Sequence, residues 1–237
     1  MVGSIAEELD ESVKRVRSSG EPLPLQLQRI ADTVRERAPV FAEQVDSFVD
    51  RLERAGAGDG APAIGETMPG FLLPDQDGRL VALDVLLERG PVAIAFVRGH
   101  WCPYCRLNAS DLALASAEAK PLQLVLISPE TQQFIRELHA ESGADFPFLS
   151  DFGNGYALSL NLAIWVDDAM STLIAGAGWD VPRFQGAPGW VLPIPSVFVV
   201  DSSGTIVARH VDPDYRRRFD LRAVLPQLKA KLQGVNS

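Results

Sequence analysis

The two cysteines of this chain lie only three positions apart, and this pair constrains the fold more than any other feature. They occur in the segment Trp101-Cys102-Pro103-Tyr104-Cys105. An apolar run at 92–97 precedes them, as expected for a buried strand, and a helical pattern follows at 103–119. Pro103 has the fixed φ that suits the first turn of a helix. The sequence therefore predicts a strand, a short connection and a helix whose N-terminus carries Cys102.

A cysteine at a helix N-terminus is suited to nucleophilic chemistry. Free N–H groups and the positive end of the helix dipole stabilise a thiolate there, and the pKa of such a thiol can fall from ~8.5 to about 3.5–7.5. Cys105 lies one helical turn further on, where it can attack a sulfenic acid or a mixed disulfide formed on Cys102. We therefore expect Cys102 to be the attacking thiolate and Cys105 the resolving thiol.

Several neighbours of the pair are candidates for supporting roles. Arg98 and Arg106 flank the cysteines, and either guanidinium would stabilise a thiolate that it faced, although both are also ordinary surface residues. Trp101 is expected to pack beside the site, and Tyr104 to be exposed and to contact partners. His100 is a candidate base or positive neighbour, but its place in an extended segment leaves its direction open.

Two structural interpretations of the cysteine pair compete with the redox one. A structural zinc site needs four ligands, whereas the chain offers two cysteines and the scattered histidines His100, His139 and His210. An inert buried pair is the second alternative, because cysteine often serves as a small core residue. The position at a helix start favours redox chemistry, and we expect neither a metal nor a cofactor.

The chain divides into a helical N-terminal part and a larger α/β part. Apolar residues recur at helical spacing between about 4 and 52, and Glu21-Pro22-Leu23-Pro24 separates two expected helices. Small, turn-forming and acidic residues at 55–62 predict a linker. We therefore place an N-terminal helical extension and linker at 1–59 and the main domain at 60–237.

Strand and helix patterns alternate in the main domain. Two short runs around Asp75-Gln76-Asp77-Gly78 predict a hairpin, followed by a short helix near 84–88. The strand–helix–strand order of 92–127 implies a parallel pair with a crossover. Strands are expected at 92–97, 122–127, 197–200 and 205–208, and helices at 103–119, 130–141 and 219–232.

An insert between Trp165 and Pro193 is rich in Gly, Trp and Pro and is expected to be a long loop. Loops of this length are usually either functional or disordered. Its aromatic residues, which include Trp179 and Trp190, either form a substrate wall or a dimer contact, or pin the loop as a small cluster of their own.

A resemblance to a known family rests on four motifs. In chain order they are Phe71-Leu72-Leu73-Pro74-Asp75 with Asp77-Gly78, Arg98-Gly99-His100-Trp101-Cys102-Pro103-Tyr104-Cys105-Arg106, Phe148-Leu149-Ser150-Asp151, and Pro195-Ser196-Val197-Phe198-Val199-Val200-Asp201 with Gly204. Together they resemble the peroxiredoxin-like branch of the AhpC/TSA (alkyl hydroperoxide reductase and thiol-specific antioxidant) family. The resemblance implies an α/β thioredoxin-like fold, with a central mixed sheet flanked by helices.

The resemblance also implies an antioxidant peroxidase. In that family a cysteine in the position of Cys102 reduces hydroperoxides through a sulfenic acid. A disulfide then forms, here with Cys105, and a thioredoxin-type or low-molecular-weight thiol reduces it. The implied partners are therefore a hydroperoxide and a thiol reductant.

Two positions differ from the usual family pattern and keep other functions open. Gly99 stands where peroxiredoxins usually carry Thr or Ser, and Pro195 stands where they usually carry Arg. Pro195 instead resembles the cis-proline opposite the cysteine pair of thioredoxins, so Ile194–Pro195 is a candidate cis bond. The alternatives are a thiol-disulfide oxidoreductase acting on protein or small-molecule disulfides, and a redox sensor or partner-binding module.

The composition of the chain limits the classes of partner and the cellular location that we expect for the protein. Twenty-two basic and thirty-one acidic residues give a formal charge of -9, which argues against binding to nucleic acid or to an anionic membrane. No apolar run approaches the ~20 residues that span a bilayer, and the first ten residues do not resemble a signal peptide. We expect a cytoplasmic protein, and homodimer formation is left open.

Overall fold

A five-stranded mixed sheet forms the centre of the fold. The computed structural model describes residues 4–234. The strand order is β5-β4-β3-β8-β9, in which β3, β4 and β5 are parallel and β8 and β9 each run antiparallel to their inner neighbour. The predicted parallel crossover is therefore confirmed. The strands are β3 (Val92–Phe96), β4 (Gln123–Ser128), β5 (Phe148–Ser150), β8 (Ser196–Val200) and β9 (Ile206–Val211).

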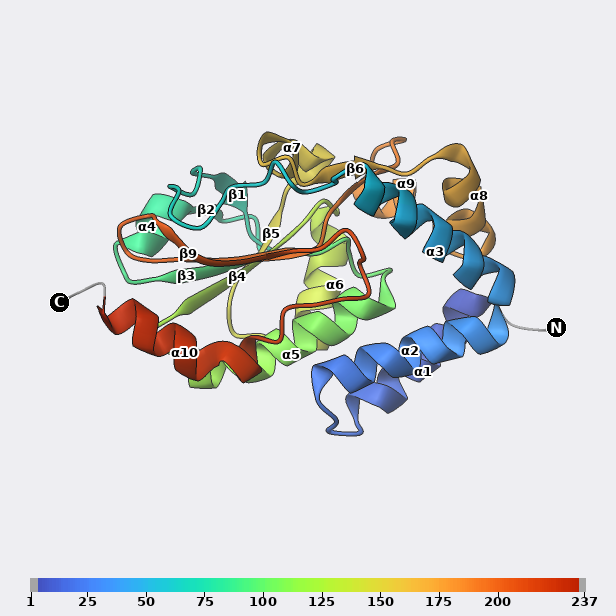
Figure 1. Cartoon of the computed structure of the whole chain (residues 1–237), viewed down its shortest axis with the longest axis horizontal. Coiled ribbons are helices and arrows are strands. Elements are labelled where there is room, and N and C mark those ends of the chain that lie inside the picture. Colours follow the sequence, from blue (N-terminus) through green and yellow to red (C-terminus); the bar gives the residue numbers. More distant parts are fainter. Residues whose placement is uncertain (1–3, 235–237) are drawn as a thin grey trace.

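Apolar side chains alternate between the two faces of this sheet, as the period of a strand requires. In β3, Ala93 and Ala95 belong to the hydrophobic cluster on one face, and Ile94 and Phe96 to the cluster on the other. Helices α5 (Pro103–Ala119), α6 (Gln132–Ser142) and α10 (Leu221–Gly234) cover the first face (Figure 1). Small alanines on β3 let α5 lie close to the sheet.

Short elements cover the second face. The predicted hairpin is present as β1 (Leu72–Pro74) paired antiparallel with β2 (Leu80–Ala82). The helices on this side are α4 (Leu83–Leu87) and α7 (Gly155–Ser159), and the 3-10 helix η1 (Phe152–Asn154) comes directly before α7. Leu83 and Leu86 of α4 and Ala157 of α7 join the cluster around Phe96.

The N-terminal part forms three helices rather than the two predicted. They are α1 (Ile5–Arg17), α2 (Leu23–Arg37) and α3 (Pro39–Arg54). The unpredicted break lies at Ala38, whose φ of -139° and ψ of 64° are non-helical, because Pro39 disfavours a helical conformation in the residue before it. The turns at 55–60 follow α3, and the domain boundary at 60 remains a prediction.

Helices α1 and α2 pack on α5, so α5 is buried between them and the sheet (Figure 1). Every residue of α5 from Pro103 to Leu112 is buried. A surface helix would present a polar face to water, whereas this part of α5 presents none. The cysteine pair therefore begins a helix in the interior of the molecule.

The insert is not the long loop that its composition predicts. It contains α8 (Asp168–Gly176) and α9 (Val181–Gln185), and β6 (Ala163–Trp165) pairs antiparallel with β7 (Val191–Pro193) at its ends. The backbone N–H of Met170 donates to the Asp167 side chain at 2.8 Å, which caps α8, and Asp180 caps α9 in the same way. The prediction of a loop was wrong because two short capped helices lack a clear apolar period.

None of the helices within residues 4–234 combines the length and the apolar content needed to cross a membrane. Within the same residues, His, Cys, Asp and Glu form no group of three or more that could hold a metal ion.

Candidate active site

The cysteine pair lies at the predicted junction between a strand and a helix. Cys102 is the residue that caps the N-terminus of α5, with φ -89° and ψ 116°, and Pro103 occupies the first helical position. The backbone N–H groups of Cys105 and Arg106 donate to the carbonyl oxygen of Cys102 at 3.0 and 3.1 Å. Both cysteines are reduced, and both side chains are 0% exposed. Any reaction at Cys102 therefore takes place away from bulk water.

Arg98 contacts both sulfur atoms. Its Nη2 donates to Cys102 Sγ at 3.0 Å, and its backbone N–H donates to Cys105 Sγ at 3.3 Å. The guanidinium carbon lies 3.4 Å from the centroid of the Tyr215 ring and 5.0 Å from that of the Trp101 ring. Cation–π contacts of this kind hold a guanidinium in place. Arg98 is thus a fixed positive charge beside the sulfur of Cys102.

The two thiols have opposite protonation tendencies. Burial alone would raise the pKa of Cys102, but the hydrogen bond from Cys105 and the charges of Arg98 and Arg218 bring that pKa well below its usual value. Burial, together with the bond to Cys102 and the charge of Cys102, raises the pKa of Cys105 well above its usual value. The arrangement favours a thiolate at Cys102 and a neutral thiol at Cys105, which is the pattern of an attacker and a resolver.

A second arginine that the sequence did not reveal also contacts the cysteine pair. Arg218 Nη2 donates to Cys105 Sγ at 3.4 Å. It comes from the segment between β9 and α10, which also supplies Tyr215. No local pattern links positions 113 residues apart, so this contact was not predictable from the sequence.

A buried carboxyl group, also missed, lies beneath the loop before Cys102. Glu130 is 0% exposed, and its Oε2 accepts from the backbone N–H of His100 at 2.8 Å. Burial, together with the charge of Cys105, raises the pKa of Glu130 to about 8, against the opposing effect of its hydrogen bonds. Glu130 follows β4 as Cys102 follows β3, and the carboxyl ends of neighbouring parallel strands meet at one edge of a sheet. This position directly after a strand was the one feature of the sequence that could have indicated Glu130 as a site residue.

Gly99 makes room for this carboxyl group. Its φ is +139°, and a Cβ atom added there would lie 2.4 Å from Cδ of Glu130. Glycine is required at this position both by the backbone conformation and by the close approach of Glu130. The residue that departs from the usual family pattern therefore has a structural cause in this chain.

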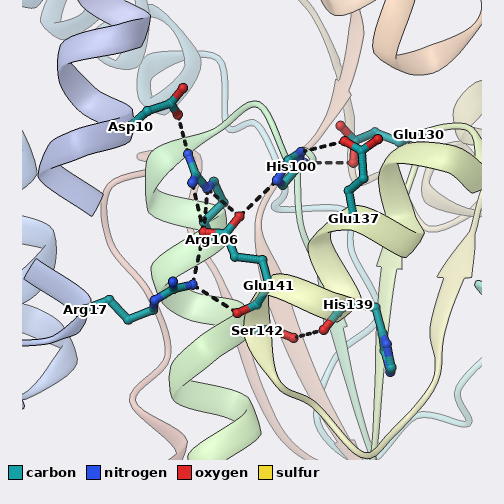
Figure 2. A network of polar contacts seen from close by, with 9 residues as sticks. All are labelled: Asp10, Arg17, His100, Arg106, Glu130, Glu137, His139, Glu141 and Ser142. Carbon is teal, nitrogen blue, oxygen red and sulfur yellow. Dashed lines mark hydrogen bonds and ion pairs between the residues drawn. The ribbon is translucent and has the colours of Figure 1, made fainter. Parts of the chain in front are cut away.

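Arg106 does not face the sulfur atoms as expected of a supporting residue. It is turned toward Glu141, with Nη2 donating to Oε1 at 2.8 Å, and it also pairs with Asp10 of α1 (Figure 2). Burial would raise the pKa of Glu141, but hydrogen bonds from His100 and Arg106 lower it to about 2. Arg106 therefore joins α1 to α5 and α6, a structural role rather than a role at the thiols.

His100 also points away from the cysteines. Its Nε2 lies 2.9 Å from Oε2 of Glu141, and Figure 2 shows the ring between Glu137 and Glu141. The loop position that the sequence left open thus places the imidazole in the ion-pair network of α6. In the described chain its contact with the site is through its backbone N–H, which binds Glu130.

The remaining predicted site residues differ in outcome. Trp101 packs beside the site and is buried, as expected. Tyr104 was predicted to be exposed, which is wrong: it is 4% exposed because Tyr215 packs against it edge-on, with centroids 5.4 Å apart.

Pro195 is buried near the site. The Ile194–Pro195 bond, which the sequence offered as a candidate cis bond, is trans. The cis bond among the described residues is Lys120–Pro121.

Comparison with known proteins adds two findings on the sequence. The profile of the AhpC/TSA family matches residues 64–209. A thiol:disulfide interchange protein DsbE homolog from Paracoccus denitrificans (strain Pd 1222) is 30% identical over 189 residues, which cover 77% of this chain and 81% of that protein. Both similarities are to proteins whose names refer to thiol chemistry.

Solved structures resemble this fold over most of their length. Peroxidoxin BcpB from Mycobacterium tuberculosis superposes with a TM-score of 0.55 at 23% identity, covering 70% of this chain and 96% of that one. A thiol peroxidase from Chromobacterium violaceum gives a TM-score of 0.53 at 16% identity, covering 73% and 90%. These likenesses confirm the α/β fold with a central mixed sheet that the sequence predicts.

Proposed function

The chain belongs to the AhpC/TSA family of thiol oxidoreductases, and on that premise we propose that it is a thiol-dependent peroxidase with Cys102 as the peroxide-reducing residue. The observation that carries the proposal is the 3.0 Å contact between Arg98 Nη2 and Cys102 Sγ. A fixed guanidinium beside the sulfur favours the thiolate before the reaction and an oxyanion during it.

The proposed reaction has three steps. The Cys102 thiolate attacks the terminal oxygen of a hydroperoxide, the O–O bond breaks, and the alkoxide or hydroxide that leaves takes up a proton. Cys102 is now a sulfenic acid, and the substrate has been reduced to an alcohol or water. The Cys105 thiol then attacks the sulfenic sulfur, water leaves, and a Cys102–Cys105 disulfide forms.

An external thiol completes the cycle. A thioredoxin-type dithiol or a low-molecular-weight thiol reduces the disulfide by thiol–disulfide exchange, with Cys102 as the better leaving group because its pKa is the lower of the two. Both sulfur atoms are buried, so a protein reductant needs a local opening of the helices around α5.

Disulfide exchange with other substrates is the second candidate function. The similarity to a thiol:disulfide interchange protein DsbE homolog favours it, as does a cysteine pair with one low and one high pKa. In this case Cys102 attacks a substrate disulfide rather than a peroxide, and Cys105 releases the product.

Steady-state turnover separates the two functions. Peroxide consumption is measured with dithiothreitol or a thioredoxin system as the reductant, and insulin reduction by dithiothreitol is measured in parallel. The peroxidase function predicts multiple turnovers of peroxide that are lost in Cys102→Ser, and a single turnover in Cys105→Ser. Equal peroxide consumption by Cys102→Ser would contradict it, and acceleration of insulin reduction alone would select disulfide exchange.

A further inference from the structure

A cavity of about 470 Å³ is bordered by the N-terminal helices and by the segment that joins β9 to α10. Residues of α2, of α3 and of the segment 214–218 line it. Two of the lining residues, Gln28 and Arg35, are exposed, so the cavity is open to solvent. Arg218 also lines it, and the Nη2 atom of the same residue donates to Sγ of Cys105 at 3.4 Å. Arg218 therefore connects this cavity with the resolving sulfur.

Arg218 differs from the other arginines of the cavity because its guanidinium has no carboxylate as a partner. Its Nη2 atom donates to Cys105, and its Nε and Nη1 atoms are buried without an acceptor among residues 4–234. Buried donors rarely stay unpaired in native structures, because each loses its hydration without replacement. The other three arginines form ion pairs: Arg35 with Asp46, Arg216 with Asp214, and Arg217 with Asp214.

Reduction of a Cys102–Cys105 disulfide is expected to begin at Cys105. In thiol–disulfide exchange, the sulfur with the lower pKa is the better leaving group. The pKa of Cys102 is lowered and that of Cys105 is raised, so Cys102 is the sulfur that leaves. An external thiolate that expels Cys102 forms its new bond to Cys105. The sulfur under attack is therefore the one that Arg218 contacts.

An anion in the cavity would draw Arg218 away from Cys105. The Nε and Nη1 atoms can gain acceptors if the side chain turns toward the cavity, and a carboxylate supplies two oxygen atoms in the arrangement that a guanidinium binds. These charge-assisted hydrogen bonds offset the loss of one bond to a thiol sulfur, which is a weak acceptor. The turn would also uncover the buried sulfur of Cys105 on the side of the cavity.

The charge of the cavity is opposite to that of the whole chain. The chain has a formal charge of -9, which repels anionic small molecules in general. Four arginines and three aspartates line the cavity, and the arginine in excess of the carboxylates is the one beside Cys105. An anion is therefore attracted at the place from which the disulfide would be attacked.

Resting on the disulfide of the proposed function, we propose that this cavity binds a low-molecular-weight thiol that carries a carboxylate, with the carboxylate at Arg218 and the thiolate directed at Cys105. The thiolate forms a bond to Sγ of Cys105, the disulfide breaks, and Cys102 leaves as a thiolate. A second thiolate attacks the sulfur of the bound reductant, and Cys105 leaves and takes up a proton. Two reductant thiols are oxidised to their disulfide, and the cysteine pair gains two electrons. Arg218 is then a specificity-determining residue for the reductant.

The first test uses the wild-type protein and two reductants that differ in charge, 3-mercaptopropionate and its methyl ester. The cysteine pair is first oxidised with diamide, an azo compound that accepts two electrons and two protons from two thiols. Reduction is followed by alkylation and mass spectrometry. Each rate constant is expressed per thiolate and divided by that of the same thiol with bis(2-hydroxyethyl) disulfide, which cancels differences in intrinsic reactivity.

We expect the acid to react at least about fivefold faster than the ester on this scale, as one ion pair to an arginine would provide. Without a local site, the net charge of the chain would make the acid the slower of the two. Equal rates, or a faster ester, overturn the inference.

Two substitutions locate the selectivity. Arg218→Met should lower the ratio of acid to ester to about one or below, because the carboxylate loses its partner. Arg79→Met removes the same charge from a side chain that is 76% exposed and lies outside the cavity, and it should keep the wild-type ratio. Loss of Arg218 also raises the pKa of Cys102, but a poorer leaving group slows both reductants alike. A ratio that a folded Arg218→Met variant retains overturns the inference.

The oxidation step separates this inference from the function on which it rests. Diamide forms the disulfide without a peroxide, so a ratio that depends on Arg218 supports the inference even where peroxide oxidises the protein slowly, a result that overturns the peroxidase function alone. Reduction that is independent of charge overturns the inference and leaves the peroxidase function intact. Failure of diamide to join Cys102 to Cys105 overturns both, because each requires this disulfide.

Discussion

Arg98 and Cys102 are joined by a hydrogen bond of 3.0 Å from Nη2 to Sγ in the interior of the protein. The same arginine lies over the ring of Tyr215 and so has little freedom to move away. A buried thiol without such a neighbour would have a raised pKa, because burial disfavours the charged form. Together with the hydrogen bond from Cys105, the contact therefore favours the thiolate form of the reactive cysteine.

Replacing Arg98 is expected to raise the pKa of Cys102. Removal of an opposite charge at this distance shifts a pKa by roughly 1–3 units, so Arg98→Met should move the pH midpoint of Cys102 alkylation by iodoacetamide upward by that amount. Arg106→Lys is the matched control, because Arg106 pairs with Glu141 and Asp10 rather than with a sulfur. Identical alkylation profiles for wild type and Arg98→Met would show that Arg98 does not control the thiolate.

Glu130 is expected to make the stability of the protein depend on pH. Its folded-state pKa of about 8 is above the ordinary value of 4.5, so its protonated form contributes stability that is complete below pH 4.5 and is lost as pH rises through 8. Each unit of pKa difference corresponds to about 1.4 kcal/mol. The titratable group that faces it is Cys105 of α5; its other contacts are backbone N–H groups and the Ser128 hydroxyl.

The Glu130→Gln variant tests this dependence. Because glutamine does not titrate, the free energy of unfolding of the variant should fall much less between pH 4.5 and 8 than that of wild type, as measured by urea denaturation. Glu43→Gln, at an exposed position of α3, should retain the wild-type slope. If the free energy of unfolding fell equally steeply with pH in wild type and in Glu130→Gln, a group other than Glu130 would cause the pH dependence.

Gly99→Ala is expected to destabilise the protein by roughly 3 kcal/mol, from backbone strain and from the collision with Glu130. For the same reasons, Gly99→Thr is not expected to restore a hydroxyl group at this position in an otherwise unchanged chain. In a Glu130→Ala background the cost of Gly99→Ala should become smaller, because the collision is removed and only the strain remains. Thermal denaturation provides the comparison.

A glycine elsewhere serves as the control for this substitution. At Gly189 an added methyl group meets no described atom within 4 Å, so Gly189→Ala should leave the melting temperature nearly unchanged. Equal effects at Gly99 and Gly189 would mean that the loop before Cys102 adapts freely, contrary to the tight fit described above.

The sequence predicts those features that local patterns determine. The apolar run at 92–97, the proline at 103 and the following helical pattern place Cys102 at the start of α5, and the structure agrees at both ends of that helix. The hairpin and the parallel crossover follow from turn residues and strand–helix–strand order in the same way. Each of these depends on neighbours within a few positions.

The features that the sequence missed depend on packing between distant segments. Arg98 and Arg106 are equally far from Cys102 along the chain, but Arg106 lies on α5 and is turned toward Glu141, while Arg98 lies in the loop over the sulfur. Tyr104 is covered by Tyr215, and Cys105 is contacted by Arg218, both from the segment before α10. The spacing of residues along the chain does not show which way such side chains point.

The most direct test of the proposed function is the rate at which a hydroperoxide oxidises the reduced protein. Stopped-flow mixing with hydrogen peroxide and with cumene hydroperoxide is followed by tryptophan fluorescence, since Trp101 adjoins Cys102. We expect oxidation at least about a thousandfold faster than that of free cysteine, equivalent to roughly 4 kcal/mol of barrier, and we expect it to be lost in Cys102→Ser. Oxidation by both peroxides no faster than that of free cysteine at the same pH would contradict it.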